Sequence, residues 1–212
     1  MIVRSSGADQ GPHIAMIHTT IVNVGYRSTN YWVISAGTNR VLVDLGWPGM
    51  IGALKANLDR AGVPLAEIRY AIATHYHIDH AGAAEDLKRL GVPLMVLESQ
   101  VGAIPMMKQH TKPQDNYTEI TSTGNLVVKC ADTRALFAKI GIAGEVVPTT
   151  GHSDDSVTVV LDEGAAFTGD LTPMMMAEPH NTEALAASWQ RLRDLGVKTI
   201  YPGHGPSRRL EP

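Results

Sequence analysis

The chain has 212 residues, of which 44% are hydrophobic and 18% are charged, an ordinary globular composition whose length fits one large domain. Its formal net charge is −3, from 18 basic and 21 acidic side chains with no long run of either sign. The basic stripe of a nucleic-acid-binding protein is therefore missing, and we expect no nucleic-acid partner.

Apolar, β-branched runs predict strands along most of the chain. In order, they cover residues 13–24, 31–35, 40–46, 68–74, 93–98, 125–130, 144–149, 156–162, 165–169 and 198–203. Helical spacing of apolar residues predicts helices over 48–62, 80–91, 132–141 and 181–196. Strands that begin as a meander and then alternate with helices indicate sheets covered by helices, in an α/β or α+β layered fold. Residues 101–124 show neither period and are predicted to form a long loop or lid.

Targeting features are missing from the sequence. Residues 1–20 contain no uninterrupted apolar core of the kind a signal peptide needs. No window approaches the roughly 18 apolar residues of a membrane span. The single cysteine, Cys130, excludes an internal disulfide and suits a reducing compartment. We therefore expect a cytoplasmic protein without a membrane partner, and we expect Cys130 to be a buried, unreactive thiol at the end of a strand.

Residues 74–80, with the sequence THYHIDH, place three histidines and an aspartate between a predicted strand and a predicted helix. Residues two apart in an extended backbone point the same way, so His75 and His77 are expected on one side. The chain then turns, and Asp79 and His80 begin the helix in another direction. One metal ion could take the first pair and another the second, but each would need further ligands, because transition-metal sites have four or more.

Three later motifs supply candidate ligands at strand ends beside glycine. His152 lies in TTGHSDDS, Asp170 in FTGDL and His204 in YPGHG. Glycine next to a ligand lets the backbone approach closely and turn sharply. A lone histidine is more often a core or surface residue, and a lone aspartate more often caps a turn, but four ordered motifs together favour a metal site. Histidine and carboxylate ligands without thiolate suit zinc, with iron or manganese as alternatives.

The motifs THYHIDH, TGHSDD, FTGD and PGHG resemble, in this order, those of the metallo-β-lactamase-fold hydrolases, over residues 20 to 206. The resemblance implies a four-layer αββα sandwich, formed as a single domain over residues 1–212, with the site at one sheet edge. It also implies the ligand set: His75, His77 and His152 for one metal ion, Asp79, His80 and His204 for a second, and Asp170 as the bridge. Asp44, in LVDLG, falls where the family often has an aspartate that orients a ligand histidine.

Two divalent metal ions per chain, zinc in the first instance, would explain hydrolysis without a serine or cysteine nucleophile. Metal ions roughly 3.5–4 Å apart can share a hydroxide, lower its pKa and polarise the substrate's oxygen. Asp79 could also orient this hydroxide, so Asp79 and Asp170 are the predicted catalytic residues. The expected reaction is hydrolysis of an ester, lactone or thioester carbonyl in a small-molecule substrate.

Other activities of the resembled family stay open as alternatives: a phosphodiesterase, a β-lactamase-like hydrolase or a mono-iron sulfur dioxygenase-like enzyme. A true β-lactamase is disfavoured, because no export signal is found and lactamases generally lack the carboxylate at the place of Asp170. Glyoxalase II has that aspartate but carries a helical extension after its last histidine, whereas eight residues follow His204 here. A degenerate member that only binds a partner is disfavoured because all seven expected ligands are present.

Candidate substrate contacts combine aromatic, basic and methionine side chains, and methionine is common on adaptable apolar surfaces. Each could equally pack a loop against the core. The candidates are Tyr26, Arg27, Tyr76, Met106, Met107, Lys108, His110, Tyr117, Met174, Met175 and Met176.

Overall fold

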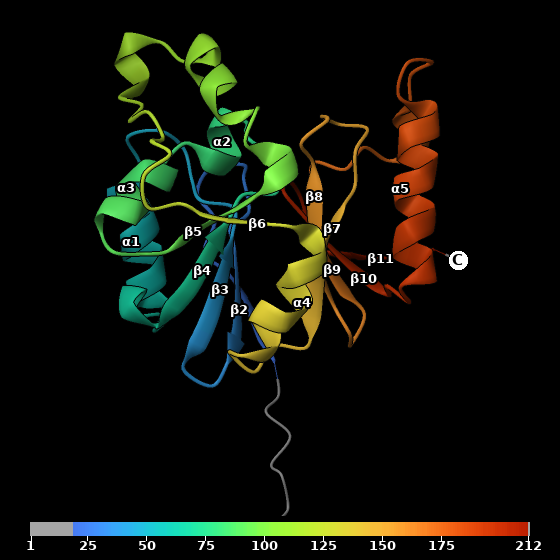
Figure 1. Cartoon of the computed structure of the whole chain (residues 1–212), viewed down its shortest axis with the longest axis horizontal. Helices are drawn as coiled ribbons and strands as arrows, with labels where there is room; N and C mark the ends of the chain where they lie inside the picture. The colour runs from blue at the N-terminus through green and yellow to red at the C-terminus, as the bar shows by residue number, and fades with distance from the viewer. Residues whose placement is uncertain (1–18, 212) are drawn as a thin grey trace, which may run out of the picture.

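Two β-sheets form the centre of the protein in the computed structural model, which describes residues 19–211 (Figure 1). In this range, one sheet has six strands in the order β1-β2-β3-β4-β5-β6 and the other has five in the order β11-β10-β9-β8-β7. The strands of the first sheet are β1 (Thr20–Asn23), β2 (Trp32–Ala36), β3 (Asn39–Val43), β4 (Ile68–Ile72), β5 (Leu94–Leu97) and β6 (Leu126–Val128). Those of the second are β7 (Gly144–Pro148), β8 (Val157–Leu161), β9 (Ala165–Gly169), β10 (Thr199–Pro202) and β11 (Arg208–Arg209).

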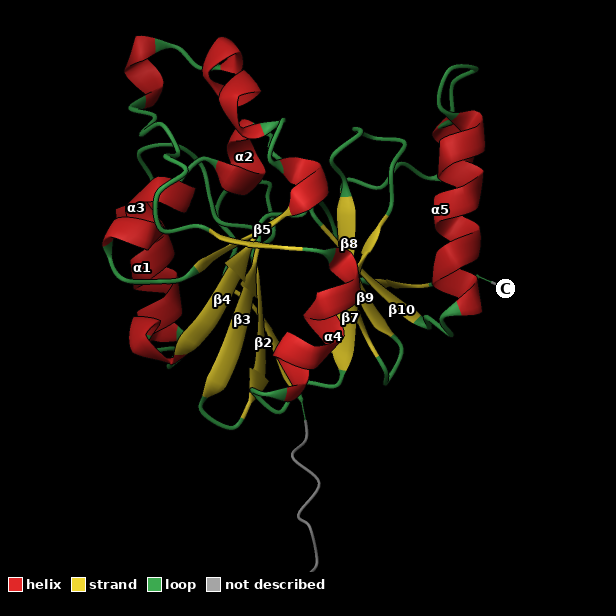
Figure 2. Cartoon of the chain, viewed as in Figure 1, coloured by secondary structure: helices red, strands yellow, loops and turns green. Residues whose placement is uncertain are grey.

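Helices cover the outer faces of both sheets (Figure 2). The α-helices are α1 (Ile51–Arg60), α2 (Ile78–Ala81), α3 (Ala84–Arg89), α4 (Cys130–Ala138) and α5 (Thr182–Asp194). The 3-10 helices are η1 (Leu65–Glu67), η2 (Glu98–Gln100), η3 (Ile104–His110), η4 (Pro113–Asp115) and η5 (Met174–Met176). Figure 1 shows α1 and α3 beside the six-stranded sheet, α5 beside the five-stranded sheet and α4 in front, where the two sheets face each other.

The fully buried strands lie in the interior of the two sheets. In the first sheet β1, β2 and β3 form an antiparallel meander, and β3 to β6 then pair in parallel. In the second sheet β9 and β10 are parallel, whereas β7–β8, β8–β9 and β10–β11 are antiparallel. All five residues of β2, β8 and β9 are buried, as expected for strands covered on both faces.

Three apolar clusters fill the spaces between the four layers. Val33 and Leu42, which face each other across β2 and β3, pack toward α1 and α3. Their strand neighbours Ile34 and Val43 point the other way and meet Phe167 of the second sheet. A third cluster joins the outer face of the second sheet to α5 through three buried residues of that helix: Leu185, Trp189 and Leu192. The predicted layered fold of sheets covered by helices is confirmed.

The predicted helix over 80–91 is wrong in its extent, because it is two helices, α2 and α3. The amide of Ala83 donates to the carbonyl of Gly46 over 3.2 Å and so leaves the helical ladder. Gly82 is packed against Pro48, with no room for a Cβ atom. A glycine-dependent contact with the β3–α1 connection therefore interrupts the helix just after the metal motif.

Other differences from the prediction are local. The strand expected over 125–130 ends at Val128, and Cys130 instead begins α4, where it is half-buried rather than buried. Of the strand expected over 13–24, residues 13–18 lie outside the described residues, and β1 occupies Thr20–Asn23. Residues 101–124 lie mostly in turns and the short 3-10 helices η3 and η4. Within residues 19–211, no helix has the length and apolar character that crossing a membrane requires.

Candidate metal centre

All seven predicted ligands follow strands that end at the same edge of the two sheets, the upper edge in Figure 1. Three histidines and Asp79 follow β4, whereas His152 follows β7. Asp170 comes directly after β9, and His204 lies two residues after β10. The fold therefore brings together side chains that are up to 129 residues apart in the sequence, from His75 to His204.

The first group of converging side chains consists of His75, His77 and His152. Nε2 of His75 lies 3.0 Å from Nδ1 of His77. Nε2 of His152 lies 3.2 Å from the same atom of His77. Nitrogens that bind one tetrahedral zinc ion at 2.0–2.1 Å would lie roughly 3.3 Å apart, so the spacing suits a shared cation.

The second group consists of Asp79, His80 and His204. Oδ2 of Asp79 lies 3.2 Å from Nε2 of His204 and 3.5 Å from Nε2 of His80. The hydroxyl of Thr29 donates a hydrogen bond to the same carboxylate oxygen over 3.1 Å. A neutral donor therefore holds Asp79 in the orientation that directs it to both imidazoles.

Asp170 lies between the two groups. Its Oδ1 is 3.3 Å from Nε2 of His80, and its Oδ2 is 3.4 Å from Nε2 of His204 and 3.8 Å from Nε2 of His152. One carboxylate thus faces histidines of both groups with its two oxygens, as a bridging ligand would.

In His80 and His204, the ring nitrogen that points away from the centre is held by a hydrogen bond. Nδ1 of His80 donates to Oδ2 of Asp44 over 2.9 Å, and Nδ1 of His204 donates to the backbone carbonyl of Ser28 over 2.8 Å. These bonds fix the tautomer that leaves Nε2 free to bind a metal ion. Asp44 is buried and has φ of 64°, a left-handed conformation that is uncommon outside glycine.

Glycine allows the strands to approach the centre closely. A Cβ atom on Gly203 would lie 2.5 Å from Cε1 of His80 and 2.6 Å from Oδ1 of Asp170. Only glycine fits immediately before His204, which explains the PGHG sequence.

Two buried polar atoms in the described part of the chain point into the centre without a hydrogen-bond partner: Nε2 of His80 and Oδ1 of Asp170. A buried polar atom without a partner carries a desolvation cost of about 1–3 kcal/mol, so such atoms call for a ligand. An imidazole nitrogen and a carboxylate oxygen are both donors that divalent transition metals accept. The residues present therefore fit the metal ions that the motifs imply.

Electrostatics favour the protonation states that bind metal at His75, His152 and Asp170, but not at His80. Burial alone would lower the pKa of His80, but the carboxylates of Asp44 and Asp170 raise it well above its usual value, so a bound metal ion would have to displace this proton. Burial, together with the surrounding histidines, holds the pKa of His75 well below its usual value, and burial likewise lowers the pKa of His152. Burial alone would raise the pKa of Asp170, but the neighbouring His80 lowers it overall. Neutral imidazoles beside an ionised carboxylate are the forms that bind a cation.

Three supporting residues were not predicted. Thr29 holds Asp79, and Asp155 accepts a hydrogen bond from the amide of Tyr76 over 2.7 Å. Gln100, which is fully buried, donates through Nε2 to the carbonyls of Thr74 and Asp155 over 3.3 and 3.2 Å. Asp155 stands three residues after His152 in GHSDD and could have been chosen from that motif, whereas nothing around Gln100 or Thr29 marks them.

Some of the predicted substrate contacts lie beside the centre. Tyr76, Met107 and His110 line a cavity of about 380 Å3 together with the candidate ligands His77 and Asp79. Met176 lines a second cavity of about 320 Å3 that meets the centre through His152, Asp170 and His204. The ring of Tyr76 is buried and also packs in the apolar core.

Other predicted contacts are engaged elsewhere or exposed. The guanidinium of Arg27 stacks on two aromatic rings, 5.7 Å from the centroid of Tyr26 and 5.6 Å from that of Trp47. Lys108 forms an exposed ion pair with Glu119. The hydroxyl of Tyr117 faces the sulfur of Met107, and three further methionines are exposed: Met106, Met174 and Met175.

The layered fold and the site at the edge of the sheets are typical of one class of protein, and the sequence comparison agrees. Residues 24–204 match the sequence model of the metallo-beta-lactamase superfamily, and the chain belongs to this superfamily. The resemblance inferred from the four motifs is confirmed.

The individual proteins to which the chain is similar share little of its sequence. The chain is 26% identical to Beta-lactamase-like protein 2 homolog of Caenorhabditis elegans over 188 residues, which covers 85% of this chain and 57% of that protein. It is 28% identical to Atrochrysone carboxyl ACP thioesterase of Aspergillus fumigatus over 186 residues, which covers 84% of this chain and 51% of that protein. The chain thus spans between about half and three fifths of the length of these relatives.

Solved structures share the fold. Metallo-beta-lactamase family protein TTHA1429 from Thermus thermophilus matches with a TM-score of 0.68 and 19% identity over 90% of this chain and 74% of that chain. TTHA1623, solved in a di-iron-bound form, matches with a TM-score of 0.68 and 24% identity over 90% of this chain and 94% of that chain. These likenesses, together with the two sheets and their helices, confirm the predicted αββα sandwich.

Proposed function

We propose that this protein is a metal-dependent hydrolase that cleaves a thioester, or a related ester or lactone, at its carbonyl carbon. The observation that carries the proposal is the position of Asp170 between the two groups of ligands, with one oxygen toward His80 and the other toward His204 and His152. The name of the Aspergillus fumigatus relative, a thioesterase, makes the thioester the first candidate among these substrates.

The seven converging side chains are the proposed ligands of two divalent metal ions, with Asp170 shared between them. Bound metal ions would supply a water molecule of lowered pKa and Lewis acidity toward the carbonyl oxygen. We propose zinc, with iron or manganese as alternatives, and the di-iron form of TTHA1623 keeps iron among the candidates.

The chain's own residues then orient the reactants and move protons. Asp79, held by Thr29, is placed to accept a hydrogen bond from the attacking water and so to orient it. In the overall reaction a carbon–oxygen bond forms from water, the acyl carbon–sulfur bond breaks, and one proton from water ends on the thiol. Tyr76 and Met107, beside His77, offer an apolar surface for the acyl group. The cytoplasmic location and the absence of a nucleic-acid partner stay predictions.

A substrate panel on protein of known metal content tests this function. Elemental analysis is followed by assays of thioesters, aryl esters, lactones, β-lactams and a phosphodiester, before and after chelation and reloading with zinc, iron or manganese. We expect metal-dependent thioester hydrolysis that Asp79→Asn lowers by at least about 100-fold, whereas the exposed Asp59→Asn changes it less than about twofold. Phosphodiester cleavage well above thioester cleavage would contradict the proposal, and so would oxygen consumption by protein with one iron per chain.

A further inference from the structure

Two cavities meet the candidate metal centre through two or more of the proposed ligands each, and a third, of about 470 Å3, touches it through His152 alone. We call the first the apolar cavity; its lining consists of Tyr76, His77, Ile78, Asp79, Met107 and His110. We call the second the arginine cavity; beside its ligands His152, Asp170 and His204, the side chains that matter here are Leu171, Met176 and Arg208. A substrate cleaved at a point between these two cavities would have one part in each.

The apolar cavity suits an uncharged acyl group. The side chains of Tyr76 and Met107, which line it beside His77, are only 4% and 1% exposed. Its ionisable side chains are the two proposed ligands His77 and Asp79, together with His110 and the buried phenol of Tyr76. A charged acyl group would lose its hydration there without gaining an opposite charge.

Arg208 lines the arginine cavity, whereas no lysine or arginine lines the apolar cavity. Arg208 belongs to β11, which pairs with β10, the strand that leads to His204, in the register Ile200↔Arg208. Arg208 is exposed, and its guanidinium has no hydrogen bond or ion pair with any residue between 19 and 211. An unpaired guanidinium at the edge of the centre is suited to bind a carboxylate or phosphate of the substrate.

We propose that Arg208 binds an anionic group on the leaving side of the scissile bond, so that the apolar acyl part lies in the apolar cavity and a negatively charged thiol departs through the arginine cavity. This inference rests on the proposed hydrolysis and adds the substrate's orientation and the residue that selects its leaving group. The charge could belong to a carboxylate close to the sulfur or to a phosphate at the end of a longer thiol.

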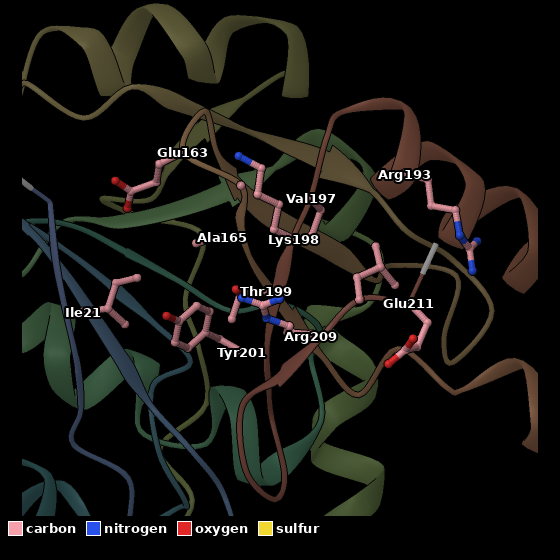
Figure 3. Close-up of a pocket in the computed structure, with 12 residues that line it drawn as sticks. Ile21, Glu163, Ala165, Arg193, Val197, Lys198, Thr199, Tyr201, Arg209 and Glu211 are labelled. Atoms are coloured by element: carbon pink, nitrogen blue, oxygen red, sulfur yellow. The ribbon is translucent and has the colours of Figure 1, made fainter.

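Arg209 provides a matched control, because successive residues of a strand point to opposite faces. It pairs with Thr199 and lines a different cavity, of about 740 Å3, together with Tyr201, Lys198 and Glu163 (Figure 3). Figure 3 shows the Arg209 side chain beside Thr199 and Tyr201. None of the seven proposed metal ligands lines that cavity. Arg208→Gln and Arg209→Gln therefore remove the same charge from adjacent positions, one inside the arginine cavity and one outside it.

The test uses metal-loaded protein and thioesters of one acyl group, octanoyl, on leaving thiols that differ in charge. N-acetylcysteamine and 3-mercaptopropionate form the short pair, and pantetheine and 4′-phosphopantetheine form the long pair. A glutaryl thioester of N-acetylcysteamine places the charge on the acyl side instead. Arg208→Lys keeps the cation, and thermal unfolding confirms that each variant folds.

We expect Arg208→Gln to lower kcat/KM about five- to tenfold for one or both anionic leaving groups, through KM, and less than about twofold for the neutral ones. Arg208→Lys should retain most of the preference, and Arg209→Gln should behave as the wild type. The preference should also weaken as salt concentration rises. Whether the carboxylate or the phosphate responds identifies the source of the charge. An equal loss for charged and neutral thiols, or a loss specific to the glutaryl substrate, would overturn the proposed orientation.

A binding measurement separates this inference from the proposed function. The probe is S-methyl 4′-phosphopantetheine, which has no thiolate to bind metal, with S-methyl pantetheine as its neutral match, both measured by calorimetry. The phosphorylated probe should bind more tightly than its neutral match, and Arg208→Gln should remove this difference. That result would support the anion site even if no thioester is hydrolysed. In that case only the proposed hydrolysis fails. Hydrolysis that depends on Asp79 without any Arg208-dependent preference in kinetics or binding would reject the inference and leave the function standing. If the protein shows no hydrolysis and no Arg208-dependent binding, both the proposed function and the inference are rejected.

Discussion

Nδ1 of His80 donates a hydrogen bond to Oδ2 of Asp44 over 2.9 Å, and both side chains are buried. The second carboxylate oxygen of Asp44 accepts hydrogen bonds from the amide and the hydroxyl of Thr74, over 2.8 and 2.9 Å. One aspartate at the end of β3 therefore orients an imidazole of the candidate metal centre and fixes the residue before His75. This relationship makes Asp44 the most informative position outside the proposed ligand set.

Asp44→Asn should weaken metal binding at the position formed by Asp79, His80 and His204. Asparagine tolerates the left-handed backbone of Asp44, so the fold is expected to persist. Its amide oxygen can replace the contact to Thr74, which turns the NH2 group toward His80 and favours the wrong imidazole tautomer. We expect metal affinity to fall about 10- to 100-fold, measured by competition with a chromophoric chelator. The exposed Asp59→Asn is the control, and an unchanged affinity for both ions would show that Asp44 has no part in the site.

Asp170→Ala tests the proposed bridge directly. Removal of a carboxylate that faces both groups should reduce the metal content from two ions to one and lower turnover by at least about 100-fold. Elemental analysis and kcat are measured on the same preparation, with the exposed Asp162→Asn as the control. A variant that keeps the wild-type rate would make Asp170 a structural turn residue.

The comparison of sequence and structure shows which features are locally encoded. His75, His77, Asp79 and His80 could be predicted as a group because one turn carries them all, and the extended backbone predicts that His75 and His77 point the same way. The interruption between α2 and α3 could not, because it depends on the carbonyl of Gly46, a partner on another element. The apolar, β-branched runs likewise predicted the layers but not which strands pair.

Supporting residues around the site were hidden for the same reason. Gln100 acts on carbonyls 26 to 55 residues away, and Thr29 acts on a carboxylate 50 residues away. No local sequence pattern reveals such contacts, because a polar residue in a loop looks the same in the sequence whether or not it has a distant partner. The proposed ligands can thus be read from the sequence, whereas the hydrogen bonds that hold them become visible only once the two sheets are packed together.

Gln100→Leu should destabilise the fold and loosen the loops that follow β4 and β7. Gln100 bridges the carbonyls of Ala73, Thr74 and Asp155, so leucine would leave buried acceptors without a donor. We expect the free energy of unfolding, measured by urea titration, to fall by about 2–4 kcal/mol. Gln114→Leu replaces an exposed glutamine and should change it by less than about 0.5 kcal/mol. Equal stabilities of the two variants would mean that water replaces the amide of Gln100 at no cost.

The thiol of Cys130 should be unreactive in the folded protein, although it is only half-buried. Burial raises the pKa of its thiol, an effect that the positive charge of Arg191 opposes only in part. The thiolate fraction at neutral pH is therefore small, and thiolate is the reactive form. Reaction with a disulfide reagent should be slower in the folded protein than in the urea-unfolded chain, and Cys130→Ser should keep the wild-type metal content. Loss of bound metal in that variant would reveal an unpredicted ligand.

Glu85 should make the stability of the fold depend on pH. Glu85 is buried on α3, where it pairs with Nζ of Lys88 over 2.8 Å and accepts a hydrogen bond from the amide of Thr121 over 3.0 Å. Burial alone would raise the pKa of Glu85, but these two contacts lower it below its usual value. A carboxylate with a lowered pKa stabilises the fold above its unfolded pKa, about 4.3, and this contribution is lost as the pH falls through the folded pKa.

Glu85→Gln should therefore lower the free energy of unfolding by about 1–2 kcal/mol at pH 7, and the difference from the wild type should shrink as the pH falls below about 4.3. Because Thr121 lies in the 101–124 segment and its amide donates to Glu85, amide exchange near Thr121 should accelerate in the variant at pH 7 as well. The exposed Glu98→Gln is the matched control and should leave the stability at both pH values within about 0.5 kcal/mol of the wild type. A Glu85→Gln difference that stays constant from pH 7 down to pH 3.5 would mean that the charge of Glu85 is irrelevant and that only its shape supports the fold.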